Sequence, residues 1–557
     1  MTLKDLAARF ATPRRAPLLA AVIAFVAALP GLFTLPATDR DESRFAEASA
    51  QMLESGDFTN IMFQQVPRYK KPVGIYWLQA ASVEALSSVE ARAIWAYRVP
   101  SVLGAMLAAG ACAWGALAFL GAAEAAMAGG LLAATMALST ESILATTDAA
   151  LCGAVTLSMA ALARIYLASR GGEPAGRWTA LLFWLGMAGS VLLKGPIGPM
   201  VAGLAMLSLA IWDRRWRWLG SLRWDWGLII LAGAVLPWAF AITVVSDGGF
   251  WGSALGGDLA PKLAGGQEGH GAPPGYFLVL SPVLLFPAAI LLPAGLVHGW
   301  SQRAEPGIRF ALCWLIPSWL VFELVPTKLP HYVLPTFGAL AWLMAAALRD
   351  PLGARARWIG AALLAAVAVG VAVGGAAAAT LYGDGWSWAF EAVGAALLLA
   401  AGGIGAVLLL RRQAGRAAAI ACGLGILGHG VLAGALAPSL TRLWLSDQTA
   451  DALARAGLDP REGLTPGPVT VAGYEEPSLV FALGAPTVLG SAKDAADAIA
   501  QGRPAVVEAR QDAAFQQALS AEGGAARLAG AVQGLDYSSG HAQVLRLYRP
   551  ASENPGP

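Results

Sequence analysis

The sequence is poor in charge. Only 13% of its 557 residues are Asp, Glu, Lys or Arg, about half the share found in soluble domains. So few charged residues cannot cover the surface of a soluble protein of this length. A disordered chain is excluded because 57% of the residues are hydrophobic. The net charge of +2 argues against a general nucleic-acid binder, which needs a concentrated basic face. These absences leave a multi-pass membrane protein.

Cysteine is also scarce. The four cysteines form no CxxC pair or other ligand spacing, and each lies inside an apolar run. This placement predicts buried structural thiols rather than a redox or metal site. The C-terminal region contains no GxGxxG or Walker loop, so nucleotide binding has no support there. The four cysteines are Cys112, Cys152, Cys313 and Cys422.

Long apolar runs dominate the first 440 residues. Runs of about twenty apolar residues predict membrane-spanning helices, and we count some thirteen of them. The first follows a basic stretch, as in a secretory signal, but its length favours an uncleaved span. The predicted spans are 16–36, 93–119, 123–140, 144–168, 178–194, 196–212, 226–245, 276–299, 308–326, 332–348, 358–380, 388–410 and 416–438.

The basic residues predict an orientation. If the N-terminus is cytoplasmic, the N-terminal segment and five short loops on its side contain about half of the 38 Lys and Arg residues. This distribution obeys the positive-inside rule. An odd number of spans then places the loops 37–92 and 246–275, and everything after 438, on the outer side of the membrane. The sequence therefore predicts a multi-pass membrane protein with a cytoplasmic N-terminus.

After residue 440 the composition becomes that of a soluble domain. Short apolar strands alternate with the helical segments 491–501 and 511–523. We therefore predict an all-α polytopic membrane domain over 1–439, with a catalytic periplasmic loop at 37–92. A small periplasmic α/β domain follows over 440–557. Its predicted strands are 469–474, 486–490, 504–509 and 542–548.

The loop 37–92 begins with a cluster of acids. Apolar residues recur at helical spacing over 42–54, which predicts a helix lying along the membrane surface. Helix capping accounts for one acid at its start, but not for an Asp-Arg-Asp-Glu cluster directly after a span. Beside Arg40 and Arg44, Asp41 is therefore a candidate catalytic or substrate-orienting group, with Glu42 next to it.

Ten basic residues lie on the predicted outer side of the membrane or at its boundary, where the positive-inside rule predicts few of them. Any one of them fits a snorkelling side chain or the partner of a local carboxylate. Ten on one face indicate an anionic ligand at the outer leaflet, because Lys binds phosphate as a point charge and Arg binds it bidentately. The ten are Arg40, Arg44, Arg68, Lys70, Lys71, Arg92, Arg98, Lys194, Lys262 and Lys328.

The segment 68–77 concentrates this pattern. Pro72 disfavours a helical conformation at Lys71, so the basic pair Lys70 and Lys71 is predicted on an extended turn. The two lysines repel each other, and a bound anion would relieve that repulsion. The aromatic side chains of the segment fit either an interfacial belt or a stacking surface for a sugar or prenyl chain. These aromatic residues are Tyr69, Tyr76 and Trp77.

Six segments in order carry a resemblance to a known family. They resemble the ArnT-like lipid-linked glycosyltransferases, which include the aminoarabinose transferases that modify lipid A and are related to the protein O-mannosyltransferases. The resemblance covers nearly the whole chain and implies a GT-C fold. It also implies transfer of a sugar from a polyprenyl phosphate, such as undecaprenyl phosphate, in the outer half of the inner membrane. The segments are DESRFAEASAQMLESGDF, KKPVGIYWLQA, TTDAAL, LLKGPIG, TKLPHYVLP and VAGYEEPSLVFALG.

The resemblance extends to individual residues. Asp41 and Glu42 match the family's acidic pair, and Lys71 matches the lysine thought to hold the donor phosphate. His270 lies in the outer loop where members often carry a histidine. We therefore predict Asp41, Glu42 and Lys71 as catalytic. The predicted donor phosphate-binding and sugar-binding residues are Arg44, Arg68, Tyr69, Lys70, Asp148, Lys262, Lys328, His331 and Tyr332.

One departure from the family concerns metal and substrate. Aminoarabinose transferases typically have a glutamate, associated with a metal site, where this chain has Lys70. A lysine repels a divalent cation, so no cofactor is firmly predicted, and His270 with an acid is the remaining metal candidate. Lys70 offers nothing to a cationic amino sugar. We therefore predict a neutral or acidic sugar, with a uronic acid such as galacturonate as one candidate.

The predicted function is transfer of a sugar from a polyprenyl phosphate to lipid A or another periplasmic glycolipid. Lys71, with Lys70 or Arg44, would stabilise the leaving phosphate. Asp41 would act as general base for a hydroxyl acceptor. The alternatives are a protein or glycan O-glycosyltransferase of the same fold and, from another class, a lipid or sugar transporter (flippase). The sequence has no pair of broken helices in matching halves, which disfavours the transporter.

Overall fold

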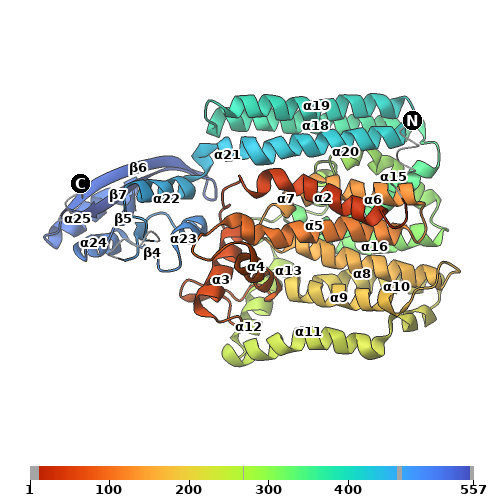
Figure 1. Cartoon of the computed structure of the whole chain (residues 1–557), viewed down its shortest axis with the longest axis horizontal. Helices are drawn as coiled ribbons and strands as arrows, with labels where there is room; N and C mark the ends of the chain where they lie inside the picture. Colours follow the sequence, from red (N-terminus) through yellow and green to blue (C-terminus); the bar gives the residue numbers. More distant parts are fainter. Residues whose placement is uncertain (1–11, 268, 461–466, 552–557) are drawn as a thin grey trace.

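The computed structural model describes residues 12–267, 269–460 and 467–551. A bundle of long helices occupies most of the molecule, and an α/β part built from the end of the chain caps one end of the bundle (Figure 1). We call this end of the bundle the domain-facing end and the other the far end. Lys4 and Arg9, which contributed to the predicted orientation, lie outside the described residues.

The helices of the bundle follow the predicted apolar runs. They are α2 (Ala16–Leu32), α5 (Ile94–Ala116), α6 (Ala122–Ala134), α7 (Met136–Ser142), α8 (Asp148–Ala168), α9 (Arg177–Lys194), α10 (Ile197–Asp213), α11 (Trp224–Val245), α14 (Tyr276–Leu284), α15 (Leu292–Ser301), α16 (Pro306–Leu324), α17 (Phe337–Ala346), α18 (Ala354–Tyr382), α19 (Ser387–Leu410), α20 (Ala414–Val431) and α21 (Ala437–Ser439).

The protein is a multi-pass membrane protein. Within the described part of the chain, eight helices are long and apolar enough to cross a membrane. The number rises to ten if the bent pairs α6–α7 and α14–α15 each form one span. Helices α2 and α10 are apolar but have only 17 residues each. Length and composition thus support eight to ten spans, fewer than the thirteen predicted, although every predicted run coincides with a helix or a bent pair.

Small residues bring the helices close together. A Cβ atom on Gly104 of α5 would lie 2.4 Å from the Cα atom of Ala150 in α8. One on Gly153 would lie 2.5 Å from the carbonyl oxygen of Gly104. Such contacts let helix backbones approach where no larger side chain would fit. The close packing fixes the start of α8, where Asp148 lies, against the half of α5 that carries Arg98.

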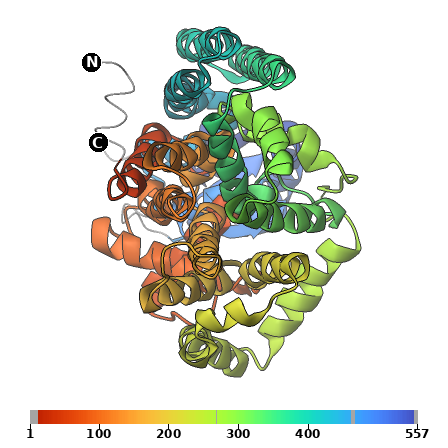
Figure 2. The same ribbon diagram turned by 90° about the vertical axis from the view of Figure 1, so that its right-hand side faces the viewer.

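The last three long helices form a separate side of the bundle. Helix α19 packs against both α18 and α20, and α20 also contacts α2. Viewed along the bundle in Figure 2, they stand at one edge, away from the helices that surround α8.

The four cysteines are buried, as predicted.

The predicted loop 37–92 contains two helices and a short hairpin. They are α3 (Asp41–Ser55), the strands β1 (Met62–Phe63) and β2 (Val66–Pro67), and α4 (Gly74–Leu86). The helix at 42–54 is confirmed, but most of its residues are buried. Its Ala46 and Ala50 share a buried cluster with Phe481 of the α/β part. The helix therefore lies between the bundle and the α/β part rather than free along a membrane surface.

The α/β part contains a five-stranded sheet. Its strands are β3 (Thr470–Ala472), β4 (Val488–Gly490), β5 (Ala505–Glu508), β6 (Ala526–Asp536) and β7 (His541–Pro550), in the order β4-β3-β5-β7-β6. The first three pair in parallel, and β5-β7-β6 pair antiparallel. The helices are α22 (Leu445–Arg455), α23 (Pro477–Leu483), α24 (Ala492–Ala500) and α25 (Asp512–Ala521). Strand β6 was not predicted, because its Ala- and Gly-rich sequence lacks the usual β-branched residues.

Candidate active site

Charged residues from distant parts of the chain meet at the domain-facing end of the bundle. They come from the segment 68–71 before α4, from the start of α8 and the end of α9, and from residues 331–332. A further contribution comes from the loop after α11, which contains α12 (Gly249–Trp251), a π-helical segment (Gly252–Leu259) and α13 (Ala260–Ala264).

Lys71 and Lys262 share one carboxylate. The Nζ atom of Lys71 lies 2.8 Å from Oδ2 of Asp258, and Nζ of Lys262 lies 2.7 Å from Oδ1. Burial, together with the charges of Lys262 and Lys194, lowers the pKa of Lys71 to about 8, although Asp258 acts in the opposite direction. Burial would raise the pKa of Asp258, but the two ammonium groups outweigh it and hold that pKa below its ordinary value. The group therefore places two cations around one negatively charged position.

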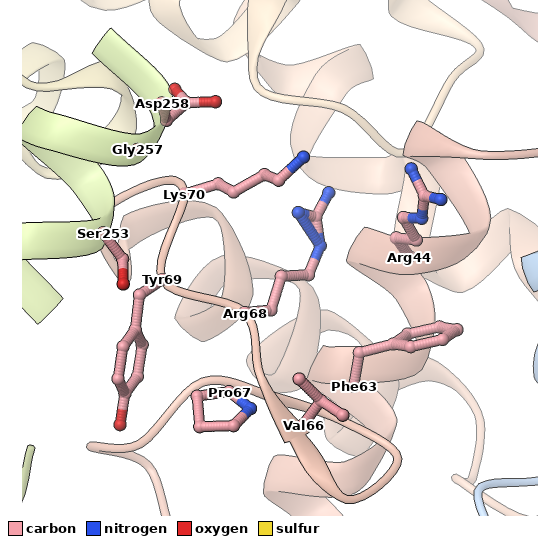
Figure 3. A pocket seen from close by; sticks show the side chains of 10 residues that line it. All are labelled: Arg44, Phe63, Val66, Pro67, Arg68, Tyr69, Lys70, Ser253, Gly257 and Asp258. Carbon is pink, nitrogen blue, oxygen red and sulfur yellow. The ribbon is translucent and has the colours of Figure 1, made fainter. Parts of the chain in front are cut away.

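Beside this group lies a cavity of about 400 Å³. The side chains of Arg44, Arg68 and Lys70 reach the same part of it from two segments of the chain, and their charged ends gather there (Figure 3). Asp258 also lines the cavity, which links it to the two-lysine group. The complete lining is Arg44, Phe63, Val66, Pro67, Arg68, Tyr69, Lys70, Ser253, Gly257 and Asp258.

Arg68 is held in place by its surroundings. It is only 7% exposed, and its guanidinium lies 4.7 Å from the centroid of the Phe45 ring. One of its terminal nitrogens lies 3.5 Å from Oδ1 of Asp41. Its Nε atom is buried and has no hydrogen-bond partner among the described residues. The neighbouring Tyr69 donates a 2.7 Å hydrogen bond to Oδ1 of Asn60. Arg68 thus presents a fixed positive charge to the cavity.

The adjacent acids Asp41 and Glu42 are in opposite environments. The Asp41 side chain is 67% exposed. Glu42 is buried and accepts hydrogen bonds from Arg98, from the backbone N–H of Ala145 and from Thr38. Burial alone would raise the pKa of Glu42, but Arg98 and the other donors outweigh it and lower that pKa. Glu42 therefore anchors the start of α3 to α5, while Asp41 is open to a substrate.

A second cluster lies beside the first. Nζ of Lys194 is 2.5 Å from Oδ1 of Asp148 and 5.0 Å from the centroid of the Tyr332 ring. Nε2 of His331 is 3.7 Å from Asp148, and its Nδ1 is 3.1 Å from Glu141. The rings of His331 and Tyr332 meet edge to face. This polar wall can contact a sugar through hydroxyl, imidazole, carboxylate and ammonium groups.

The second cluster also contains the metal-ligand set of the described residues. Ligand atoms of Glu141, Asp148 and His331 all lie within 4.8 Å of one another. Their donor types suit a divalent cation, but Lys194 already neutralises Asp148 at 2.5 Å. His270, the predicted metal candidate, is exposed and outside this set. In this arrangement Lys194 supplies the positive charge that a metal ion would otherwise bring.

Lys328 was predicted to bind the donor, but its ammonium group contacts backbone carbonyl groups. Its ammonium donates hydrogen bonds to the carbonyl oxygens of Phe322, Glu323 and Val325, at 3.3, 2.8 and 2.6 Å. All three N–H groups therefore cap the C-terminal end of α16, and we leave Lys328 out of the proposed site. Glu323 in turn accepts from the backbone N–H groups at the start of α14.

Two residues of the site were missed by the sequence analysis. Asp258 stands in a Gly-rich segment without a recognisable motif. Glu141 precedes the TTDAAL segment by five residues, and this short spacing is the only signal that could have pointed to it. The other predicted residues, apart from Lys328 and His270, lie in or next to the two clusters and the cavity.

The chain is similar in sequence to known glycosyltransferases. Residues 19–247 match the family model described as dolichyl-phosphate-mannose-protein mannosyltransferase. An undecaprenyl phosphate-alpha-4-amino-4-deoxy-L-arabinose arabinosyl transferase of Pseudomonas paraeruginosa is 30% identical over 321 residues, covering 55% of each chain. A protein of the same name from Pectobacterium carotovorum is 31% identical over 359 residues, covering 61% of this chain and 62% of its own length. The chain thus spans about half the length of the curated relatives it matches.

Solved structures of ArnT have a fold similar to that of this chain. ArnT from Cupriavidus metallidurans in complex with undecaprenyl phosphate superposes with a TM-score of 0.76 and 22% identity, over 97% of this chain and 99% of that one. Its apo structure gives a TM-score of 0.75 at 20% identity. The chain is therefore similar in sequence to these arabinosyl transferases over part of its length, and its fold is similar to that of ArnT, in agreement with the resemblance of the six segments.

Proposed function

We propose that the protein is a membrane glycosyltransferase that moves a sugar from a polyprenyl-phosphate donor to lipid A or another glycolipid. The acceptor oxygen would attack the anomeric carbon of the sugar. The bond from that carbon to the phosphate oxygen would break, and the polyprenyl phosphate would leave with the electron pair. The names of the relatives and the undecaprenyl phosphate in the Cupriavidus metallidurans structure support this donor class.

One observation carries the proposal: Lys71 and Lys262 hold the carboxylate of Asp258 between them. A carboxylate and a phosphate present similar oxygen atoms to ammonium groups. A donor phosphate that replaced Asp258 would meet two preorganised cations in a partly buried site, where charge stabilisation of a leaving group is most effective. We therefore assign Lys71 and Lys262 to the donor phosphate.

The sugar would lie against the second cluster. Asp148, His331 and Tyr332, with Lys194 between them, offer the polar groups that orient hydroxyls. We assign Arg44, Arg68, Tyr69 and Lys70 to the rest of the donor headgroup. Glu42 keeps an anchoring role through Arg98.

The membrane orientation is part of the proposal. We place the N-terminus in the cytoplasm of a bacterial cell, and the site and the α/β part (440–557) in the periplasm. Lys493→Cys puts a thiol on the exposed start of α24, whereas the four native cysteines are buried. A membrane-impermeant maleimide should label this variant in cells whose inner membrane alone is intact. Labelling only after that membrane is opened would reverse the orientation.

The activity is tested with purified full-length protein, a polyprenyl-phosphate sugar and a lipid A acceptor. We expect transfer by the wild type and a loss of about 10²–10³-fold in kcat for Lys71→Ala, the effect of removing one preorganised charge donor. Lys493→Ala, a matched change on the exposed start of α24, should keep wild-type activity. Full activity of folded Lys71→Ala would refute the mechanism.

A hydroxyl acceptor on a protein or glycan is the second candidate. The family model matched by residues 19–247 is named for a protein mannosyltransferase. The exposed carboxylate of Asp41, held near Arg68 at 3.5 Å, is available to accept a proton from such a hydroxyl. Offering peptide and lipid acceptors to the same preparation separates the two candidates.

A further inference from the structure

We propose that the α/β part holds the segment before α3 in a strained conformation and thereby positions Asp41 and Arg44 in the candidate site. The positioning residues are Ser478, Tyr537 and Ser538. Among the described residues that line the cavity, none belongs to the α/β part, so these three act through the start of α3. The inference rests on the proposed function, because it concerns the geometry of the same site.

The two residues before α3 bond directly to the α/β part, whose helix α23 lies next to α3 (Figure 1). The Asp39 carboxylate accepts a hydrogen bond from the hydroxyl of Ser478 in α23. The backbone N–H of Asp39 donates a 2.6 Å hydrogen bond to the hydroxyl of Tyr537. The guanidinium of Arg40 donates one of 3.1 Å to the carbonyl oxygen of Ser538, in the turn between β6 and β7. Three bonds from the α/β part thus converge on one dipeptide.

The backbone of Arg40 is strained. Its φ of 64° and ψ of −100° lie outside the left-handed helical region and near the first central position of a type II′ turn, which glycine normally occupies. A residue with a Cβ atom keeps such a conformation only where its surroundings impose it. Arg40 directly precedes α3, so its conformation sets the direction of the helix and the place of Asp41 and Arg44.

The bundle holds the residues on either side of this dipeptide. Glu42, paired with Arg98 of α5, accepts hydrogen bonds from the backbone N–H and the hydroxyl of Thr38, at 2.8 and 2.9 Å. The bundle therefore fixes Thr38 and Glu42, and the α/β part fixes the two residues that follow Thr38. Strain at Arg40 arises because both sets of bonds are made at once. Without the bonds to the α/β part the segment can relax, and Asp41 would move with it.

The same combination of positive φ and contact with the α/β part recurs twice in this loop. Its other non-glycine residues with positive φ are Gln64 (54°) and Arg92 (47°). The side-chain amide of Gln64 donates hydrogen bonds to the carbonyl oxygens of Ala485 and Thr487. The guanidinium of Arg92 lies 5.7 Å from the centroid of the Phe481 ring. Each such residue of the loop thus contacts the α/β part, and Gln64 does so in the turn of the hairpin that lines the cavity.

The test compares glycine with alanine at position 40 in the full-length protein in nanodiscs. Arg40→Ala and Arg40→Gly both remove the guanidinium, but only glycine adopts this backbone conformation without strain. Each is made with the contacts to Asp39 intact and together with Ser478→Ala and Tyr537→Phe, which remove them. The controls are Ser520→Ala and Tyr548→Phe, matched changes whose hydrogen bonds stay within the α/β part.

Hydrogen exchange of the backbone amides at the start of α3 reports these contacts without a substrate. We expect exchange about tenfold faster in the Ser478→Ala, Tyr537→Phe protein and no change in the controls. With the contacts intact, Arg40→Gly should exchange about fivefold more slowly than Arg40→Ala, because alanine is strained at positive φ. Without the contacts this difference should disappear. If it persists, the bundle alone imposes the strain and the proposal is wrong.

Transfer measures the positioning itself. We expect kcat/KM for the donor to fall about tenfold in the Ser478→Ala, Tyr537→Phe protein, since small misplacements of site groups are costly. In that background Arg40→Gly should be about fivefold more active than Arg40→Ala, because glycine reaches the required conformation at little cost. Wild-type kcat/KM without the contacts, or equal activity of the two position-40 variants, would overturn the proposal. If the wild type transfers no sugar, the glycosyltransferase assignment fails, and hydrogen exchange alone decides whether the α/β part imposes the strain.

Discussion

The two ends of the helical bundle carry charge clusters of different kinds. At the far end the side chain of Asp213 is 4% exposed, and its carboxylate accepts hydrogen bonds from Tyr166 at 2.7 Å and Arg170 at 2.6 Å and pairs with Arg309. At the domain-facing end the cations outnumber the acids on the wall of a cavity. Both clusters join distant helices through buried charge. The cluster at the domain-facing end also lies beside a cavity of about 400 Å³.

This difference shows which features mark a binding site. Arg170 at the far end also has a buried Nε atom without a partner among the described residues, and it lies 5.1 Å from the Tyr166 ring. An unpaired guanidinium nitrogen is therefore insufficient by itself. Arg68 differs because it lines a cavity together with two other cations. Buried charge that joins helices stabilises the bundle, whereas cationic side chains that line a cavity can also contact a ligand.

The largest expected effect is at the far end. Asp213→Ala leaves Arg170 and Arg309 without their shared carboxylate, and removal of one partner of a buried ion pair costs about 3–5 kcal/mol. We expect a large drop in melting temperature in detergent and unchanged transfer per folded molecule. Arg223→Gln, in the exposed pair with Asp225, should change stability by less than about 1 kcal/mol. If the Asp213→Ala protein is stable but has lost transfer, the far-end cluster takes part in activity and is not a purely structural cluster.

The second effect concerns Asp41, the exposed acid at the domain-facing end. Asp41→Asn removes a general base, and positioned bases contribute about 10²-fold or more. We expect that loss in kcat with a hydroxyl acceptor and a much smaller one with a phosphate acceptor, which is already anionic. Glu84→Gln on the exposed face of α4 is the control. Equal losses with both acceptors would assign Asp41 to substrate positioning instead.

Much of this architecture follows from sequence patterns. Apolar runs predict the helices of the bundle because each run must bury itself in lipid or against other helices. The basic pair before Pro72 predicts the segment that lines the cavity. Strand β6 and helices α22 and α23 were missed. The strand is rich in Ala and Gly, and α23 has only seven residues and packs partly on α3. The buried residues of α22 do recur at helical spacing, so its pattern could have predicted it.

Pairings across the chain could not be predicted. In the sequence Glu42 and Arg98 both look like members of one cluster of charges, but in the structure they form a buried ion pair with each other. Asp258 pairs with Lys71 across 187 residues. Such contacts depend on helix packing in three dimensions, which the local pattern of residues does not encode.

The third effect is a pH dependence specific to the domain-facing end. Burial lowers the pKa of Lys71 from 10.5 to about 8, so this lysine loses most of its charge between pH 7 and pH 9. We expect donor affinity to fall about tenfold over this interval in direct binding measurements. Lys71→Arg should show a flatter profile, because arginine stays charged. A wild-type profile as flat as that of Lys71→Arg would contradict the role of Lys71.

Stability should respond to pH in the opposite direction. Between about pH 8 and pH 10.5 the unfolded chain keeps the Lys71 proton that the folded chain has lost. The unfolded state then binds more protons, so the contribution of Lys71 to the free energy of unfolding rises with pH. Melting curves of the wild type and Lys71→Arg over this range should diverge in that direction. A relative loss of wild-type stability over this range would show that Lys71 is charged in the folded protein.

The smallest expected effect comes from Asp258, the one acid shared by the cavity and the two lysines. Asp258→Asn removes the carboxylate that a donor phosphate must displace from Lys71 and Lys262. A partly exposed ion pair of this kind is worth up to about 1 kcal/mol, so KM for the donor should fall about three- to fivefold. Release of the polyprenyl phosphate should slow to a similar extent, because Asp258 no longer competes for the lysines. Asp247→Asn, the same substitution in the same loop at an exposed residue with positive φ, should leave both quantities unchanged. A higher KM for the donor in Asp258→Asn would instead show that Asp258 holds Lys71 and Lys262 in place for the phosphate.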